Sequence, residues 1–345
     1  MLKVAIIGAS GYTGLELMRL SLQHPQVTLV TVTSEKFAGM QVSEVFPALT
    51  GKAALVFCSL AGGKDINQAD FVFSALPHGE SMDVVPQLLQ QGKKVVDLSA
   101  DFRLRDPDLY ETWYQKHTAP ELLSKAVYGL SELNRDRIKK AQLVANPGCY
   151  PTAVILSLAP AIKNGLIEVN SIIADVKSGV SGAGRSVLLS SLYAEINEGV
   201  KPYKVAQHQH IPEIEQELST IAQKDVTISF TPHLIPMSRG ILVTLYATLA
   251  VKISEKEVIH LYREFYKKDI FITVCPAGTF PSTNQVKGSN YCCISFVIDS
   301  RTNRLIVLSA IDNLLKGGSG QAVQNMNIMS SLKEDTGIDQ IPLFP

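Results

Sequence analysis

The 345-residue chain is too long for one typical hydrophobic core, so two domains of about 150 residues each are expected. Hydrophobic residues make up 46% of it, as in an ordinary globular protein. The 32 Lys and Arg residues balance 32 Asp and Glu residues, which gives no indication of nucleic acid or an anionic membrane as partner and favours a small molecule.

The first segment, "MLKVAIIGAS", has only a short apolar run before a glycine, which is less than the hydrophobic core of a signal peptide. No apolar stretch along the chain is long enough to predict a membrane span. The cysteines are odd in number and lack C-x-x-C spacing (Cys58, Cys149, Cys275, Cys292 and Cys293). We therefore expect a cytoplasmic protein with reduced thiols.

Through the first hundred residues, short β-branched runs alternate with amphipathic stretches. Strands are predicted over 3–8, 27–34, 53–58, 70–76 and 93–99, and helices over 12–25 and 80–92. Leu15, Met18 and Leu22 lie at helical spacing within the first of these helices. Strand and helix in this alternation indicate an α/β domain of Rossmann type, with a parallel sheet and crossover helices.

From about residue 171 the predicted strands are longer and alternate apolar with polar residues, over 170–178, 226–234, 240–251, 290–299 and 304–312. This pattern predicts a mixed or antiparallel sheet and hence a second domain of α+β type. A helix over 319–332 is expected to return to the first domain. We assign 1–148 plus 313–345 to the nucleotide-binding domain and 149–312 to the catalytic domain.

The stretch "VAIIGASGYTGLELMRL" places Gly8, Gly11 and Gly14 after a strand and at the start of a helix. Such glycines permit a tight turn, a close approach of phosphate to backbone N–H groups, and close helix packing. The spacing is G-x-x-G-x-x-G rather than the commoner G-x-G-x-x-G, and a glycine-rich turn without a ligand is the alternative. We also assign Ser10, Tyr12, Thr13 and Pro77 to this dinucleotide site.

The end of the second strand distinguishes the two nicotinamide cofactors, because an acidic residue there normally binds the ribose hydroxyls of NAD. This chain has Ser34, Glu35 and Lys36 at that place. Ser34 and Lys36 could accept a 2′-phosphate, whereas an inward-pointing Glu35 would repel it. NADP(H) is therefore the favoured cofactor.

Cys149 follows a Pro-Gly turn in "ANPGCYPTAVIL", and Pro151 suits the first turn of the helix that follows. The thiol is expected just outside the N-terminus of that helix, where the helix dipole favours a reactive thiolate. A small buried apolar side chain is the alternative, and it is the interpretation that we adopt for the other cysteines.

A base or acid for this thiol is offered by "HQHIPEIEQEL" (208–218), in which His210 precedes a predicted helix. The helix dipole there disfavours protonation, which leaves a neutral imidazole able to exchange a proton. His208 and His210 form an H-x-H pair, but no further ligand stands nearby in the sequence, so no metal site is predicted. His78, in "ALPHGES", is the one other histidine set apart by its place beyond a strand.

Further polar clusters follow predicted strands. Lys177 and Arg185 flank the glycines of "VKSGVSGAGRS", which form either an anion cradle or a mobile surface loop. Asp97, Asp101 and Arg103 lie where open α/β sheets bind ligands. In "DNLLKGGSGQA", Asn313 could bind an amide such as the nicotinamide carboxamide.

Taken in order, these segments resemble the N-acetyl-gamma-glutamyl-phosphate reductases of arginine biosynthesis over essentially the whole chain. They are "GASGYTGLEL", "LPHG", "DLSADFR", "NPGCYPTA", "SGVSGAGR", "HQHIPEIEQEL" and "DNLLKGGSGQAVQN". The resemblance implies a semialdehyde dehydrogenase-like fold, a homo-oligomer (dimer or tetramer), and NADPH-dependent reduction of an acyl phosphate with release of inorganic phosphate. It implies that Cys149 forms a thioester and that His210 moves the proton. The substrate-pocket residues that it implies are Arg103, Lys177, Arg185 and Glu213.

Other functions share parts of this pattern. A reductase of aminoadipyl phosphate in lysine biosynthesis has the same cysteine motif, whereas the glycine before Cys149 argues against an aspartyl phosphate reductase. An NADP(H)-binding redox sensor would leave the Cys149 and His210 contexts unexplained. A cysteine hydrolase or acyltransferase would not need the glycine-rich turn.

Overall fold

The computed structural model describes residues 1–187 and 189–344. It has two compact units, Met1–Pro147 with Gly318–Asp339, and Gly148–Gly317 with the residues from Gln340 onward. We expected 313–345 to belong wholly to the first domain. The structure places Asn313 in the second unit, where its side chain accepts the Gly240 N–H (2.7 Å). The tail also belongs there, because the Leu343 N–H donates to the Lys287 carbonyl (2.7 Å).

The first unit contains a seven-stranded sheet in the order β3-β2-β1-β4-β5-β7-β6, in which every pair is parallel. The strands are β1 (Leu2–Ile7), β2 (Val27–Thr33), β3 (Phe57–Cys58), β4 (Phe71–Ser74), β5 (Lys94–Asp97), β6 (Val127–Tyr128) and β7 (Leu143–Ala145). The order in which strands are added to the sheet reverses at β1, because β2 and β3 lie on one side of it and β4 and β5 on the other. In open α/β sheets this switch point is where ligands bind.

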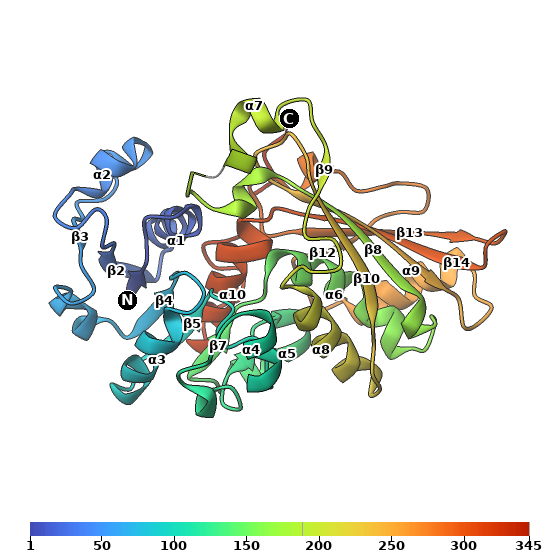
Figure 1. The fold of residues 1–345 in the computed structure, drawn as a ribbon, viewed down its shortest axis with the longest axis horizontal. Helices are drawn as coiled ribbons and strands as arrows, with labels where there is room; N and C mark the ends of the chain where they lie inside the picture. The colour runs from blue at the N-terminus through green and yellow to red at the C-terminus, as the bar shows by residue number, and fades with distance from the viewer. Residues whose placement is uncertain (188, 345) are drawn as a thin grey trace. The chain divides into compact units, whose positions relative to one another are not determined.

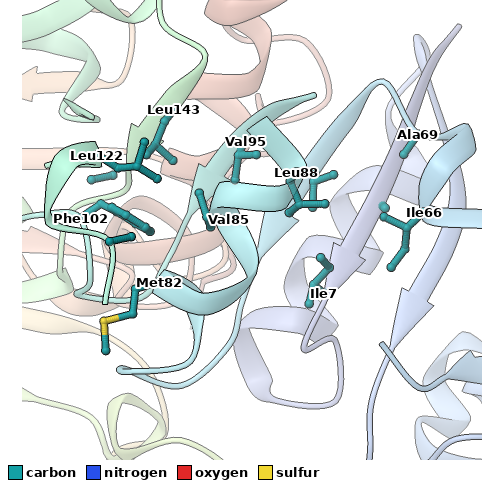
Figure 2. Close-up of a cluster of buried hydrophobic side chains, with 14 of the residues drawn as sticks. Ile7, Ile66, Ala69, Met82, Val85, Leu88, Val95, Phe102, Leu122 and Leu143 are labelled. Carbon is teal, nitrogen blue, oxygen red and sulfur yellow. The ribbon is translucent and has the colours of Figure 1, made fainter. Parts of the chain in front are cut away.

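The helices of the first unit are α1 (Tyr12–Gln23), α2 (Val42–Val45), α3 (Ser81–Gln90), α4 (Pro107–Trp113), α5 (Ser131–Ile138) and α10 (Gly320–Met329). Figure 2 shows Val85 and Leu88 of α3 in the cluster that also holds Val95 of β5, so α3 covers this face of the sheet. Alternation along β1 turns the buried Val4 and Ile6 to the other face, where α1 and α10 lie (Figure 1).

Helix α10 is buried along its whole length, polar residues included. The sequence pattern accounts for its apolar face, but buried amides need hydrogen-bond partners. The Gln321 side chain donates to the Gly129 carbonyl (3.0 Å), and that of Asn325 donates to the Asn146 side chain (3.1 Å). These bonds attach α10 to the loops around β6 and β7.

The second unit contains a mixed seven-stranded sheet in the order β12-β13-β14-β11-β8-β10-β9. Its strands are β8 (Ile172–Ser178), β9 (Lys201–Pro202), β10 (Ile228–Leu234), β11 (Ile241–Thr248), β12 (Ile272–Val274), β13 (Cys292–Asp299) and β14 (Arg304–Ile311). Its helices are α6 (Cys149–Lys163), α7 (Tyr193–Ile196), α8 (Ile211–Ala222) and α9 (Glu255–Phe265). Helices α6, α8 and α9 pack on the sheet, and alternation along β11 buries every second side chain. The expected α/β architecture is confirmed. Among the described residues, no helix combines the length and the apolar character that crossing a membrane requires.

Candidate active site

The three glycines between β1 and α1 lie in different steric surroundings. Gly8 has a φ of +77°, and a Cβ there would lie 2.7 Å from the Ala75 carbonyl oxygen beyond β4. A Cβ on Gly14 would lie 2.3 Å from the Ala9 carbonyl oxygen. At Gly11, the N-cap of α1, no atom of the described residues lies within 4 Å of such a Cβ. Open space before a helix N-terminus at a switch point fits the pyrophosphate of a dinucleotide.

The residues between these glycines lie around the same turn. Tyr12 begins α1 with an exposed side chain, and the Thr13 carbonyl accepts a hydrogen bond from the Ser319 hydroxyl (2.9 Å). The Ser10 hydroxyl accepts one from Ser34 (2.9 Å), so the glycine turn and the end of β2 are joined.

The end of β2 separates its acidic residue from its basic one. The Glu35 carboxylate accepts the Leu60 N–H (2.7 Å), which directs it to the backbone beyond β3. The Lys36 side chain is exposed, with its Nζ 5.3 Å from the centre of the Phe37 ring. Buried Ser34 and exposed Lys36 could thus receive a 2′-phosphate without repulsion from a carboxylate directed at it.

The loops that follow β4 and β5 are joined by buried polar contacts. The Gly79 N–H donates to the buried Asp101 carboxylate (2.8 Å), and the Ala100 N–H donates to Nδ1 of His78 (2.9 Å). His78 therefore has a structural contact here, and Pro77 lies in the loop that these bonds hold.

Asp97 ends β5 in a fully buried position. The hydroxyls of Ser81 (2.5 Å) and Ser99 (2.6 Å) donate to its carboxylate. The pKa of Asp97 is raised to about 6, mainly by burial and also by the neighbouring negative charge of Asp101. The Asp97 side chain is therefore bonded inside the first unit, to Ser81 and Ser99.

Cys149 is the first residue of α6, with Gly148 as N-cap. We expected the thiol just outside the helix, but the Thr152 N–H already bonds to the Gly148 carbonyl (3.0 Å), so the helix begins one turn before Thr152. The half-buried Cys149 lies beside Gly317, where a Cβ would come within 2.8 Å of the Cys149 Cβ. Its place in the first turn lets the α6 dipole stabilise a thiolate.

Helix α8 places His210 as its N-cap and Glu213 in its first turn. The Glu213 side chain is 1% exposed, and its Oε1 accepts the Gly148 N–H at 2.8 Å. The carboxylate therefore ties the first turn of α8 to the first turn of α6. The two helix starts that carry His210 and Cys149 are joined by this bond.

Tyr150 and Tyr203 distinguish the two histidines of the H-x-H pair. The Tyr150 ring meets the His210 ring edge-on at 5.6 Å between centroids, and its hydroxyl bonds to that of Tyr203 (2.6 Å). The Tyr203 hydroxyl lies 3.5 Å from Nε2 of His208. Nδ1 of His208 accepts the His210 N–H (3.1 Å), so a neutral His208 carries its proton on Nε2. Burial lowers the pKa of His208 to about 4, and this residue stays neutral near pH 7.

Comparison with known proteins identifies the family. The chain is 55% identical to the N-acetyl-gamma-glutamyl-phosphate reductase of Geotalea daltonii and 56% identical to that of Desulfotalea psychrophila, and each match covers 100% of both chains. The chain belongs to the N-acetyl-gamma-glutamyl-phosphate reductase family. Residues 3–141 match the semialdehyde dehydrogenase NAD binding domain, and residues 149–313 match the semialdehyde dehydrogenase dimerisation domain.

Solved structures extend this fold beyond the reductase family. Aspartate semialdehyde dehydrogenase II from Vibrio cholerae, complexed with ASA, superposes with a TM-score of 0.75 at 15% identity over 96% of this chain and 98% of the other. Aspartate semialdehyde dehydrogenase from Candida albicans, with NADP, gives a TM-score of 0.70 at 15% identity over 96% and 98%. At such low identity these likenesses show a shared fold.

The substrate-pocket residues implied by the reductase family lie in different surroundings. Lys177 forms an ion pair with Asp175 (2.6 Å between Nζ and Oδ2). Its neighbours Val176 and Ser178 are buried, so Lys177 points to the other face of the sheet from α6. Arg185 is exposed in the segment before the undescribed residue 188. Glu213 is bonded to the Cys149 turn, because its carboxylate accepts the Gly148 N–H.

Arg103 lies in the first unit, at 6% exposure. Its Nε donates to the Asn146 carbonyl and its guanidinium also donates to the Leu98 carbonyl, each at 2.8 Å. These bonds hold the backbone beyond β5 and β7 together.

Asn313 also makes contacts within its own unit. Its amide oxygen accepts the Gly240 N–H, and its amide nitrogen donates to the Ser181 hydroxyl (3.0 Å). It therefore joins the glycine-rich loop after β8 to the turn before β11. Its assignment to the nicotinamide carboxamide remains a prediction.

Sequence reasoning missed Gly317, Tyr203 and the ion pair of half-buried Arg239 with buried Asp312, whose Nε and Oδ2 lie 3.1 Å apart. The run of glycines after Lys316 was a signal for a close approach at Gly317. Tyr203 and Arg239 had no such signal, because only the folded chain places them beside Tyr150 and Asp312.

Proposed function

We propose that this protein reduces N-acetyl-gamma-glutamyl phosphate to N-acetylglutamate 5-semialdehyde with NADPH and releases inorganic phosphate. The observation that carries this proposal is the identity of 53–56% to reductases of that name over essentially the full length of both chains. Cys149 at the start of α6 supplies the nucleophile that such a reaction needs. The reaction belongs to arginine biosynthesis and takes place in the cytoplasm, in keeping with five cysteines that form no disulfide among the described residues.

The chain's own residues divide the reaction into two steps. The Cys149 thiolate attacks the acyl carbon, the bond to the phosphate oxygen breaks, and a thioester remains on the sulfur. The nicotinamide cofactor supplies the hydride that reduces this thioester when it is bound. His210 donates a proton to the developing oxygen, then removes it as the carbon–sulfur bond breaks and the aldehyde leaves. Backbone N–H groups at the start of α6 stabilise the negative charges.

The reverse reaction tests the substrate. The purified protein should reduce NADP+ with N-acetylglutamate 5-semialdehyde only when phosphate is present. The aminoadipyl analogue is one methylene longer, so its kcat/KM should be about 10- to 200-fold lower. Turnover that is equal or faster with the longer semialdehyde would contradict the proposed substrate.

The dinucleotide is NADP(H), held by the turn with Gly8, Gly11 and Gly14 and by Ser34 and Lys36 at the end of β2. Steric fit supports the glycines, and the direction of the Glu35 carboxylate toward the Leu60 amide supports the 2′-phosphate.

Replacing Lys36 with alanine should raise the KM for NADPH by about tenfold or more, because a charge-assisted contact to the 2′-phosphate is lost. The KM for NADH should change less than about twofold, since NADH has no phosphate there. Steady-state kinetics with both cofactors measures the effect, and Lys52→Ala, at another exposed lysine of the first unit, is the control. An equal rise in KM for both cofactors would contradict a contact between Lys36 and the 2′-phosphate.

The active form is a homodimer or a higher homo-oligomer formed through the sheet face of the second unit that α6 does not cover. The match to the dimerisation domain supports it. So does an apolar row across that face, in which Tyr246 pairs with Ile173 and Ile306, and Ile306 pairs with Val297. Ile173 is 37% exposed in the single chain. Such a row would be better buried against a second copy.

Ile173→Glu should convert the oligomer to monomers, because burying an unpaired carboxylate costs several kcal/mol, or more than about 100-fold in the dissociation constant. Analytical ultracentrifugation of native and variant protein checks this. Ile270→Glu, at an exposed position before β12, is the matched control and should leave the oligomer intact. A native protein that sediments as a monomer would refute the assignment.

A further inference from the structure

Helix α6 lacks the side chains that normally cap a helix start. Its N-cap is Gly148, which makes no side-chain cap, and the third residue of the helix is Pro151. In a capping box the side chain of the third helical residue, usually Glu, accepts the N–H of the N-cap residue of its own helix. Here Glu213, the third residue of α8, accepts the Gly148 N–H of α6 at 2.8 Å.

We propose that Glu213 is a positioning residue for the nucleophile: its buried carboxylate caps α6 from α8 and so fixes the turn that presents Cys149. The proposal rests on the proposed role of Cys149. It replaces the substrate contact that the family resemblance implies for Glu213. Because the cap comes from another helix, the N-cap position next to the thiol can be a glycine. The absence of a side chain at Gly148 keeps the space before the α6 N-terminus for the substrate.

The same arrangement has an electrostatic consequence. A carboxylate bonded to Gly148 competes with the Cys149 thiolate for the positive end of α6. The phenols of Tyr150 and Tyr203 also interact with this thiol, and their pKa values are raised mainly by burial. Neutral His208 lies next to Tyr203. His210 occupies the N-cap position of α8, three residues before Glu213.

Two substitutions separate the hydrogen bond from the charge. Glu213→Gln keeps an acceptor oxygen and removes the charge, whereas Glu213→Ala removes both. The control is Glu217→Gln, one turn later on α8, where another buried carboxylate accepts the Gln216 amide (2.9 Å). The readout is the rate of Cys149 alkylation by iodoacetamide against pH, followed on the Cys149 peptide by mass spectrometry, and it requires neither substrate nor cofactor.

For Glu213→Gln we expect the midpoint of the alkylation profile about one unit lower, since a neighbouring negative charge is gone. The melting temperature should stay within about 2 °C of native. For Glu213→Ala we expect kcat about 100-fold lower with little change in KM, because the nucleophile is misplaced. Glu217→Gln should match the native protein in all measurements.

The proposal is overturned if Glu213→Gln leaves the alkylation profile unchanged while the KM for the acyl phosphate rises tenfold or more, since Glu213 would then bind substrate. If Glu213→Ala does not fold, the alkylation profile of Glu213→Gln decides alone. A shifted profile in a protein without reductase activity would support the positioning role and refute only the proposed function.

Discussion

Replacing Cys149 with serine should lower kcat of the reductase by about 10⁴-fold while leaving the fold intact. The thiolate is the species that attacks the acyl carbon, and the helix dipole at the first turn of α6 can stabilise it. A serine hydroxyl does not ionise near neutral pH, so it is a far weaker nucleophile than a thiolate at the same position. The side chain is nearly the same size, so the close contact with Gly317 is preserved.

The measurement is phosphate-dependent reduction of NADP+ by native and variant protein at equal concentration, with melting temperatures recorded for both. Cys275→Ser is the matched control, because Cys275 is also partly buried in the second unit and follows the short strand β12. It should retain native turnover. A Cys149→Ser enzyme with more than a tenth of native activity would show that the reaction does not pass through a thioester at this position.

Replacing Gly14 with alanine should lower the free energy of unfolding of the first unit by about 3 kcal/mol or more. The new Cβ would lie 2.3 Å from the Ala9 carbonyl oxygen. The backbone fixes the positions of both atoms, so no rotamer change can move them apart. Relief requires α1 to shift away from the turn. The dinucleotide site would be lost with it, because the N-terminus of α1 forms part of that site.

Gly11→Ala provides the contrast, because its Cβ would enter open space and its φ of −82° suits alanine. Its stability should remain within about 1 kcal/mol of native, while the KM for NADPH should rise about tenfold as the methyl group meets the pyrophosphate. Chemical denaturation and NADPH titration of both variants measure these effects. Equal stability for Gly14→Ala and Gly11→Ala would contradict the packing role of Gly14.

The element pattern could be read from the chain wherever the strands were long and the periodicity clear. The strand predicted over 27–34 is β2, and that predicted over 304–312 is β14. The strand predicted over 53–58 shrinks to β3, and Val56 just before it is 47% exposed, so that run does not continue into the core. Strands β6 and β7 were missed, because two or three residues are too few for periodicity to show.

The candidate site divides in the same way. Local features indicated Cys149, His210 and the three glycines, because the dipole of a helix start and the steric freedom of glycine are properties of a short segment. Glu213 was singled out only through family resemblance, and its bond to Gly148 joins residues 65 positions apart. Lys177 was expected in an anion cradle, but strand alternation turns it to the opposite face, where it pairs with Asp175.

The sequence by itself therefore determined the α/β class, the nucleotide-binding turn, the thiol at a helix start and the family, since each is encoded in a contiguous motif or in the order of motifs. The tertiary structure decided which contacts surround them. It gave His208 a neutral, buried place behind Tyr203, and it placed Gly317 against Cys149. Such contacts depend on how helices and sheets pack, and packing brings together side chains that no local pattern connects.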